Sequence, residues 1–89
     1  MTETSINYAK ALYELSVPEE AVLETEKIFR STPQLKGALE NPLVSLKEKE
    51  HVIDRVFPQE MKNFLKVTCK YQKISSIEEI LEAYGDYSR

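Results

Sequence analysis

Hydrophobic residues recur along most of this chain at intervals of three and four, the spacing that places side chains on one face of an α-helix. The stretch 6–15, INYAKALYEL, shows this pattern most fully. On a helix its polar residues Asn7, Lys10 and Glu14 share one narrow sector. The rest is an apolar arc about twice as wide as the roughly 100° stripe of an ordinary surface helix. Part of this arc can pack inside the domain, which leaves the other part for a second contact.

The same pattern, read with its start and stop signals, predicts further helices after this one. The first helix is expected to have Thr4 or Ser5 as its N-cap and to end near Ser16. Ser16 and Glu19 have capping-box spacing with Pro18 between them, which predicts the start of a second helix. The inward positions of that helix are expected to be Ala21, Val22, Thr25, Ile28 and Phe29.

Proline and serine residues also divide the middle of the chain. Thr32 and Pro33 are expected to open a short third helix, and the pair 41–42, Asn-Pro, to end it. Ser45 and Glu48 have capping-box spacing and predict a fourth helix. The inward positions of these two helices are expected to be Leu35, Ala38, Leu39, Val52, Ile53, Val56 and Phe57.

The last third of the chain predicts two more helices. Pro58 is expected to open the fifth, the pair 75–76, Ser-Ser, to cap the sixth, and Gly85 to end the sixth. The sixth helix is expected to bury Ile77, Ile80, Leu81 and Tyr84. Since no alternating strand pattern or hairpin signal occurs, the fold class is all-α, a single-domain six-helix bundle over residues 1–89.

The fifth helix has the same excess of apolar surface as the first. Its apolar face, about 200° wide at helical spacing, comprises Met61, Phe64, Leu65, Val67, Thr68, Cys69 and Tyr71. A basic stripe of Lys62, Lys66, Lys70 and Lys73 lies beside it. If the two helices are neighbours, their spare edges form a groove for an amphipathic partner helix, with lysines at the rim to select acidic residues. The plainer interpretations are a central, surrounded helix and a solvated lysine face.

Composition narrows the class of protein. The chain has 89 residues, 42% of them hydrophobic and 30% charged, and a net charge of −3, which indicates one soluble globular domain without a general attraction for nucleic acid. It has one Cys and no apolar run long enough to span a membrane, so we expect no disulfide and no membrane insertion. These features predict a cytoplasmic protein that is monomeric in isolation.

The residue types needed for catalysis do not occur in useful combinations. His51 has no second His or Cys at metal-ligand spacing, and Cys69 has no His to form a dyad. The acidic pairs 19–20 and 78–79 lie in first helical turns, where the helix dipole favours negative charge. We therefore expect a non-enzyme with no catalytic residues, no metal site and no cofactor.

Short motifs occur in order along the chain. Residues 8–12 read YAKAL, residues 39–42 read LENP, and Ser45 and Lys47 follow. Further along come Val56-Phe57 and Asn63-Phe64-Leu65-Lys66-Val67. This series resembles the δ subunit of bacterial F-type ATP synthases, whose mitochondrial equivalent is the oligomycin-sensitivity-conferring protein. The resemblance covers nearly the whole chain but only the N-terminal half of the family's usual length. Residues 72–74 read QKI where the family commonly has G-R-L, which leaves the geometry of this turn open.

The resemblance implies a non-catalytic stator component of a rotary proton- or sodium-translocating ATP synthase, located peripherally at the cytoplasmic face of the bacterial cell membrane. It implies that the N-terminal helix of an α subunit binds in a groove between the first and fifth helices. It also implies that the C-terminal domain absent from this chain contacts the peripheral-stalk b subunit. The partner-binding positions are Tyr8, Ala11 and Val67 from the family match and Leu15, Lys66, Lys70 and Tyr71 from helical neighbourhood. The alternative is a small helical nucleic-acid-binding module that uses the lysine stripe Lys62, Lys66, Lys70 and Lys73.

Overall fold

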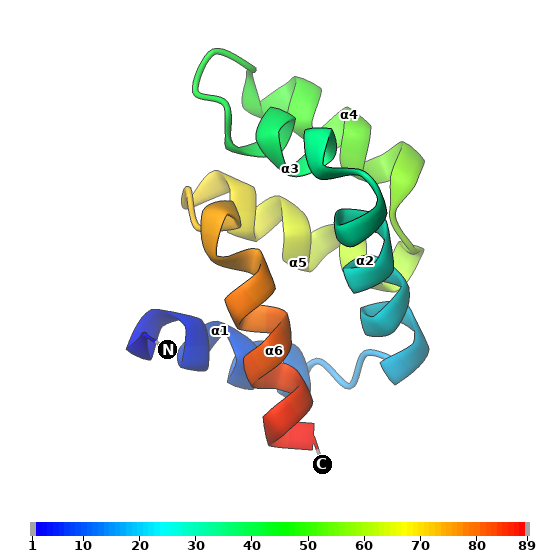
Figure 1. The fold of residues 1–89 in the computed structure, drawn as a ribbon, viewed down its shortest axis with the longest axis vertical. Coiled ribbons are helices and arrows are strands. Elements are labelled where there is room, and N and C mark those ends of the chain that lie inside the picture. The colour runs from blue at the N-terminus through cyan, green and yellow to red at the C-terminus, as the bar shows by residue number, and fades with distance from the viewer. Residues whose placement is uncertain (1, 89) are drawn as a thin grey trace.

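Helices account for most of the computed structural model, which describes residues 2–88 (Figure 1). Within that range the elements are α1 (Glu3–Glu14), α2 (Glu19–Ser31), α3 (Pro33–Glu40), α4 (Leu46–Val56), α5 (Gln59–Lys70), the 3₁₀ turn η1 (Ile74–Ser76) and α6 (Ile77–Ser88). The expected all-α bundle of six helices is confirmed.

The helices pack in two neighbouring pairs around a shared core. α1 packs along α6 and α4 packs along α5, while α2 contacts α3, α5 and α6. In Figure 1, α6 runs from the end of α5 down across α1. The most fully buried side chains come from all six helices and include Leu12, Val22, Leu39, Ile53, Met61, Leu65, Ile77 and Ile80. In this arrangement Leu15, directly after α1, and Val67 of α5 remain exposed.

Two of the predicted helix starts are wrong. The N-cap of α1 is Thr2, whose hydroxyl accepts the Ser5 backbone N–H at 3.1 Å, and neither Thr4 nor Ser5 has that role. Ser16 does not cap α2, because it adopts a left-handed backbone with φ of 57° as the chain leaves α1. An N-cap residue needs an extended backbone. Pro18 has one and occupies the N-cap of α2.

The ends of the other helices match expectation more closely. Ser45 caps α4 by accepting the Glu48 backbone N–H, and α3 begins at Pro33 after Thr32 and ends at Glu40, before the Asn-Pro pair. The prediction that Gly85 ends the sixth helix is wrong, since α6 continues through it to Ser88. A glycine ends a helix only when its backbone turns left-handed, and no glycine among the described residues has a positive φ.

Most of the predicted inward positions are buried. Cys69, Leu12 and Phe29 belong to the core, as expected. Val56 is an exception, because its side chain is 42% exposed at the end of α4. Ile28, Leu35 and Val52 are partly buried against the core, and Ala38 is also partly buried.

Candidate protein-interaction surface

The wide apolar face of α1 divides into a buried stripe and an exposed edge. Ala9 and Leu12 are in the core, and Tyr8 is partly buried against it. Ala11 is exposed, and Leu15, one turn further along the same edge, is 60% exposed. Because helical residues four apart lie one above the other, these two side chains form a continuous apolar edge beside the core.

A second exposed edge lies on α5. Phe64 and Thr68 are buried, whereas Val67 is 48% and Tyr71 is 58% exposed. Val67 and Tyr71 are also four residues apart, so they too form a strip along their helix. The Lys70 ammonium lies 5.8 Å from the centre of the Tyr71 ring, which extends the strip with a cation. The surface made of Tyr8, Ala11, Leu15, Val67 and Tyr71 is called the α1–α5 surface below.

The two edges meet through one aromatic pair. The rings of Tyr8 and Phe64 are 6.3 Å apart and nearly perpendicular, an edge-to-face contact between α1 and α5. The long contact of α1 is with α6. α1 and α5 therefore touch near their middles through this pair.

The lysine stripe of α5 is partly occupied by contacts within the molecule. Lys66 forms an ion pair of 2.8 Å with Asp54 of α4, and Lys62 donates to the side chain of Gln59 at 3.1 Å. The hydrogen bond from Lys66 holds the pKa of Asp54 below its usual value. Lys70 and Lys73 are exposed. Lys66, expected at the partner surface, thus points to α4, while Lys70 remains beside Tyr71.

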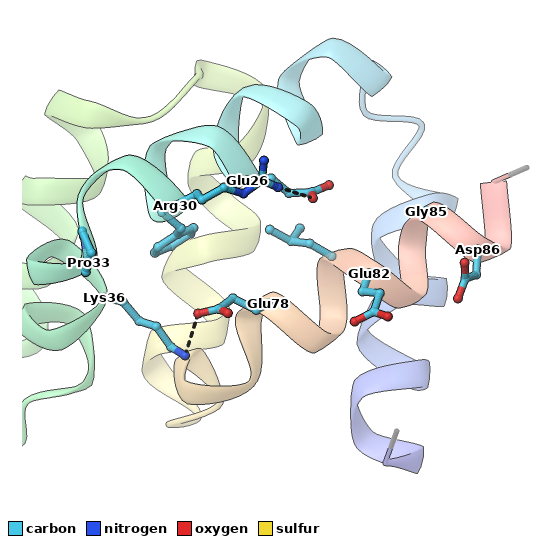
Figure 2. A pocket seen from close by; sticks show the side chains of 10 residues that line it. Glu26, Arg30, Pro33, Lys36, Glu78, Glu82, Gly85 and Asp86 are labelled. Carbon is cyan, nitrogen blue, oxygen red and sulfur yellow. Dashed lines mark hydrogen bonds and ion pairs between the residues drawn. The ribbon is translucent and has the colours of Figure 1, made fainter.

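A broad hollow lies on another side of the molecule, between α2, α3 and α6 (Figure 2). Its volume is about 670 Å³ and its base includes Phe29 and Leu81. Around its rim Lys36 pairs with Glu78 at 3.0 Å and Arg30 with Glu26 at 3.7 Å, as the dashed lines in Figure 2 show. The rim is therefore charged and largely paired with itself.

A smaller hollow of about 250 Å³ separates α1 from the end of α6. Ile6, Ala9 and Ala83 line it together with Tyr87. Tyr13 lies nearby, with its ring 5.0 Å from that of Tyr87, and both rings are about half exposed. Sequence reasoning had assigned Ile6 and Tyr13 to the apolar arc of α1 without placing them beside α6.

The groups considered for catalysis do not meet. His51 is exposed on α4. Cys69 is buried, and this burial raises the pKa of its thiol to about 11, so the reactive thiolate is scarce at neutral pH. Among residues 2–88 no group of three or more His, Cys, Asp or Glu side chains is close enough to hold a metal ion.

One polar cluster escaped the sequence analysis. Ser5 is fully buried, and its hydroxyl donates to Glu79 of α6 at 2.8 Å. The Thr2 backbone N–H donates to the other carboxylate oxygen at 3.0 Å. These donors hold the pKa of Glu79 below its usual value, the Ser5 hydroxyl most strongly. Nothing in the local sequence signals this pairing, because the partners are 74 and 77 residues apart.

Fold and surface together define a class: a small all-α domain that presents apolar helix edges to the outside. No helix within the described part is long and apolar enough to cross a membrane. The chain belongs to the ATP synthase delta (OSCP) subunit family, whose model matches residues 5–89.

Individual relatives agree with the family. The chain is 34% identical over 91 residues to the ATP synthase subunit delta of Clostridioides difficile (strain 630), an alignment covering 89% of this chain and 50% of the relative. It is 30% identical over 88 residues to the chloroplastic ATP synthase subunit delta of Trieres chinensis, an alignment covering 86% of this chain and 47% of the relative. The chain thus spans about half the length of these curated relatives. No solved structure is significantly similar to it.

Proposed function

We propose that this chain is the N-terminal domain of an ATP synthase δ subunit and acts as a non-catalytic part of the stator. The domain binds the N-terminal helix of an α subunit on the α1–α5 surface and so helps to hold the catalytic head. The binding residues are Tyr8, Ala11, Leu15, Lys66, Val67, Lys70 and Tyr71. A second half of the subunit, of the length that the relatives have, would contact the peripheral-stalk b subunit, and the complex would sit at the cytoplasmic face of a bacterial membrane.

The observation that supports this proposal is the pair of exposed apolar edges in a member of this family. Leu15, Val67 and Tyr71 are each between 48% and 60% exposed, on two helices that touch at their middles. Exposed apolar side chains that adjoin one another mark protein contacts more often than isolated ones do. An amphipathic helix would cover both edges and turn its polar face to water.

Lys66 has a changed role in this proposal. Its ammonium is paired with Asp54, so it supports the position of α5 against α4 through that contact. Its alkyl stem can still pack against a partner helix, as long lysine stems commonly do. Lys70, which lies over the Tyr71 ring, is the cation available to an acidic group of the partner.

Two substitutions test the surface. Ala11→Trp would fill the space that lets a third helix approach, and Val67→Asp would place a charge in the apolar strip. Each should leave the circular dichroism spectrum and melting temperature nearly unchanged. Each should weaken binding of a synthetic α-subunit N-terminal peptide at least tenfold, about 1.4 kcal/mol, in isothermal titration calorimetry.

Leu23→Asp is the matched control, because Leu23 is 55% exposed on α2, away from this surface. It should bind the peptide as the wild type does. Unchanged affinity in both test variants would refute the proposed surface, and equal losses in all three variants would show an effect of charge or folding and not of position.

A further inference from the structure

The broad hollow between α2, α3 and α6, called the α2–α6 hollow below, is separate from the α1–α5 surface. None of the described residues that line it belongs to α1 or α5. Its volume is about 670 Å³, and the buried side chains of Phe29 and Leu81 form its floor. A hollow of this size with an apolar floor can take an anchor side chain from a partner protein.

Gly85 forms part of the wall of the α2–α6 hollow. It lies within α6 and its φ is not positive, so the local backbone does not require glycine. Glycine in the interior of a helix costs about 1 kcal/mol relative to alanine. In return this position has no side chain, which leaves the hollow deeper than any other residue would. Gly85 therefore serves the shape of the hollow at the expense of the helix.

The charges around the hollow are unevenly divided. Nine of the chain's 15 acidic residues but only three of its 12 basic residues belong to α2, α3 and α6. Lys73, which precedes η1, does not line the hollow. The charged residues that do line it are Glu26, Arg30, Lys36, Glu78, Glu82 and Asp86. This side of the molecule is therefore acidic.

Ion pairs within the molecule leave two of the lining acids without a cation. Arg30 and Lys36 each pair with a glutamate of the rim. Glu82 and Asp86 are exposed, and neither takes part in an ion pair found among residues 2–88. These two residues are four apart and lie one turn apart along α6, in the row that Figure 2 shows. The hollow thus combines an apolar floor with two adjacent negative charges.

We propose that the α2–α6 hollow binds a cationic amphipathic helix of a partner protein. Lysine or arginine side chains of that helix pair with Glu82 and Asp86, and an apolar side chain lies over Phe29 and Leu81. Charge complementarity identifies this occupant. Cations one turn apart on the partner match the spacing of the two acids, which is about 6 Å along the axis of α6. This contact goes beyond the proposed function and does not depend on it.

Titration with a synthetic amphipathic peptide of leucine and lysine tests the binding. Its lysines lie one turn apart on one face, and a second peptide has glutamate in place of each lysine. The first peptide should shift the amide NMR signals of Arg30 and Gly85, on opposite walls of the hollow, in the isotope-labelled 89-residue chain. The second should not bind. Shifts only outside the hollow, or no binding of the leucine–lysine peptide, would overturn the proposal.

Two double variants distinguish a defined site from general attraction between opposite charges. Glu82→Gln with Asp86→Asn should weaken binding of the leucine–lysine peptide about tenfold, and the loss should shrink as salt is added. The matched control, Glu20→Gln with Glu24→Gln, removes two charges at the same spacing on exposed positions of α2 that do not line the hollow. It should bind nearly as the wild type does. Equal losses in the two double variants would overturn the proposal.

Filling the hollow gives a second readout that leaves the charges unchanged. Gly85→Leu should weaken peptide binding while favouring the helical state of α6. Gly37→Leu is the matched control, because Gly37 is an exposed residue of α3 whose added Cβ would meet no heavy atom within 4 Å. It should bind as the wild type does. Unchanged affinity in Gly85→Leu would overturn the proposal.

The outcomes for the two proposed surfaces are distinguishable. Ala11→Trp, which tests the α1–α5 surface, should leave binding of the leucine–lysine peptide unchanged. If Ala11→Trp and Gly85→Leu weakened that binding equally, the peptide would not be recognising the α2–α6 hollow, and the present proposal would be overturned. The α-subunit peptide tests the proposed function separately.

Discussion

Glu79 connects the beginnings of two helices that are far apart in the sequence. One of its carboxylate oxygens accepts the Ser5 hydroxyl and the other accepts the Thr2 backbone N–H. Thr2 is also the N-cap of α1, so the same few atoms cap the start of α1 and attach it to the first turn of α6. Since α1 forms one side of the proposed binding surface, this cluster helps to position that side.

The cluster predicts an acid-sensitive contribution to stability. The pKa of Glu79 is lowered in the folded protein, so its contribution is complete above the unfolded-state value of 4.5 and is lost as the pH falls through the lower folded value. Glu79→Gln should therefore lower the melting temperature at neutral pH and flatten its decline in acid. Thermal melts over a pH series would measure both effects.

Glu82→Gln is the matched control, because Glu82 is exposed on the same helix and takes part in none of the ion pairs found among residues 2–88. It should keep the acid profile of the wild type. If Glu79→Gln kept that profile as well, the hydrogen bonds to Ser5 and Thr2 would not stabilise the fold.

At the scale of single helices, the end of α5 explains an unusual residue. Gln72 has a positive φ of 58°, and the backbone N–H groups of Gln72 and Lys73 donate to the carbonyls of Cys69 and Thr68. This is the pattern of a Schellman motif, in which glycine is the preferred left-handed residue. The turn that the sequence left open is thus a helix cap that uses glutamine where the family resemblance would place glycine.

Replacing that glutamine should stabilise the protein. A side chain in the left-handed region costs about 1–2 kcal/mol relative to glycine, partly offset by the greater freedom of glycine in the unfolded chain. Gln72→Gly should therefore raise the free energy of unfolding by about 0.5–1 kcal/mol, measured by urea denaturation. Gln34→Gly, inside α3, should instead lower the free energy of unfolding, because glycine disfavours a helix. A loss of stability in Gln72→Gly would show that its side chain makes a compensating contact.

The two sides of α1 should respond differently to the same truncation. Leu12 is fully buried, so Leu12→Ala should cost about 2–5 kcal/mol. Leu15 is 60% exposed, so Leu15→Ala should change stability by only about 0.5 kcal/mol while weakening α-subunit peptide binding. Denaturation and calorimetry on both variants would measure this. Equal stability losses would mean that α1 is rotated from the orientation described here.

At the scale of the whole molecule, charge separates the proposed function from its alternative. The chain has a net charge of −3, and Asp54 neutralises Lys66 in the middle of the lysine stripe. Lys70 and Lys73 remain exposed, which is too little positive charge for a nucleic-acid surface.

We therefore expect no measurable binding of a single-stranded oligonucleotide at physiological salt in fluorescence anisotropy, and peptide binding that depends only weakly on salt. Phosphate contacts would instead give a log–log slope of about −0.7 for each contact. A salt dependence of oligonucleotide binding that corresponds to several phosphate contacts, and that disappears in Lys70→Gln, would favour the nucleic-acid module over the stator domain.

The sequence by itself determined the helices, the inward faces and the exposed apolar edges. These features follow from periodicity and from short-range signals, such as the Ser45 cap, that act within a turn or two. The burial of Leu12 and Cys69 and the exposure of Leu15 and Val67 agree with this reasoning, because side-chain direction along a helix follows from its geometry.

Only the tertiary structure decided which edges lie near each other and which charges are free. Ser5 reads as a candidate N-cap until Glu79 approaches it from α6, and Lys66 reads as a rim cation until Asp54 approaches it from α4. Gly85 reads as a stop, yet α6 continues through it while packing along α1. Each of these outcomes depends on a second helix, so the physical reason is the same: contacts between distant segments outweigh local preferences of about 1 kcal/mol or less.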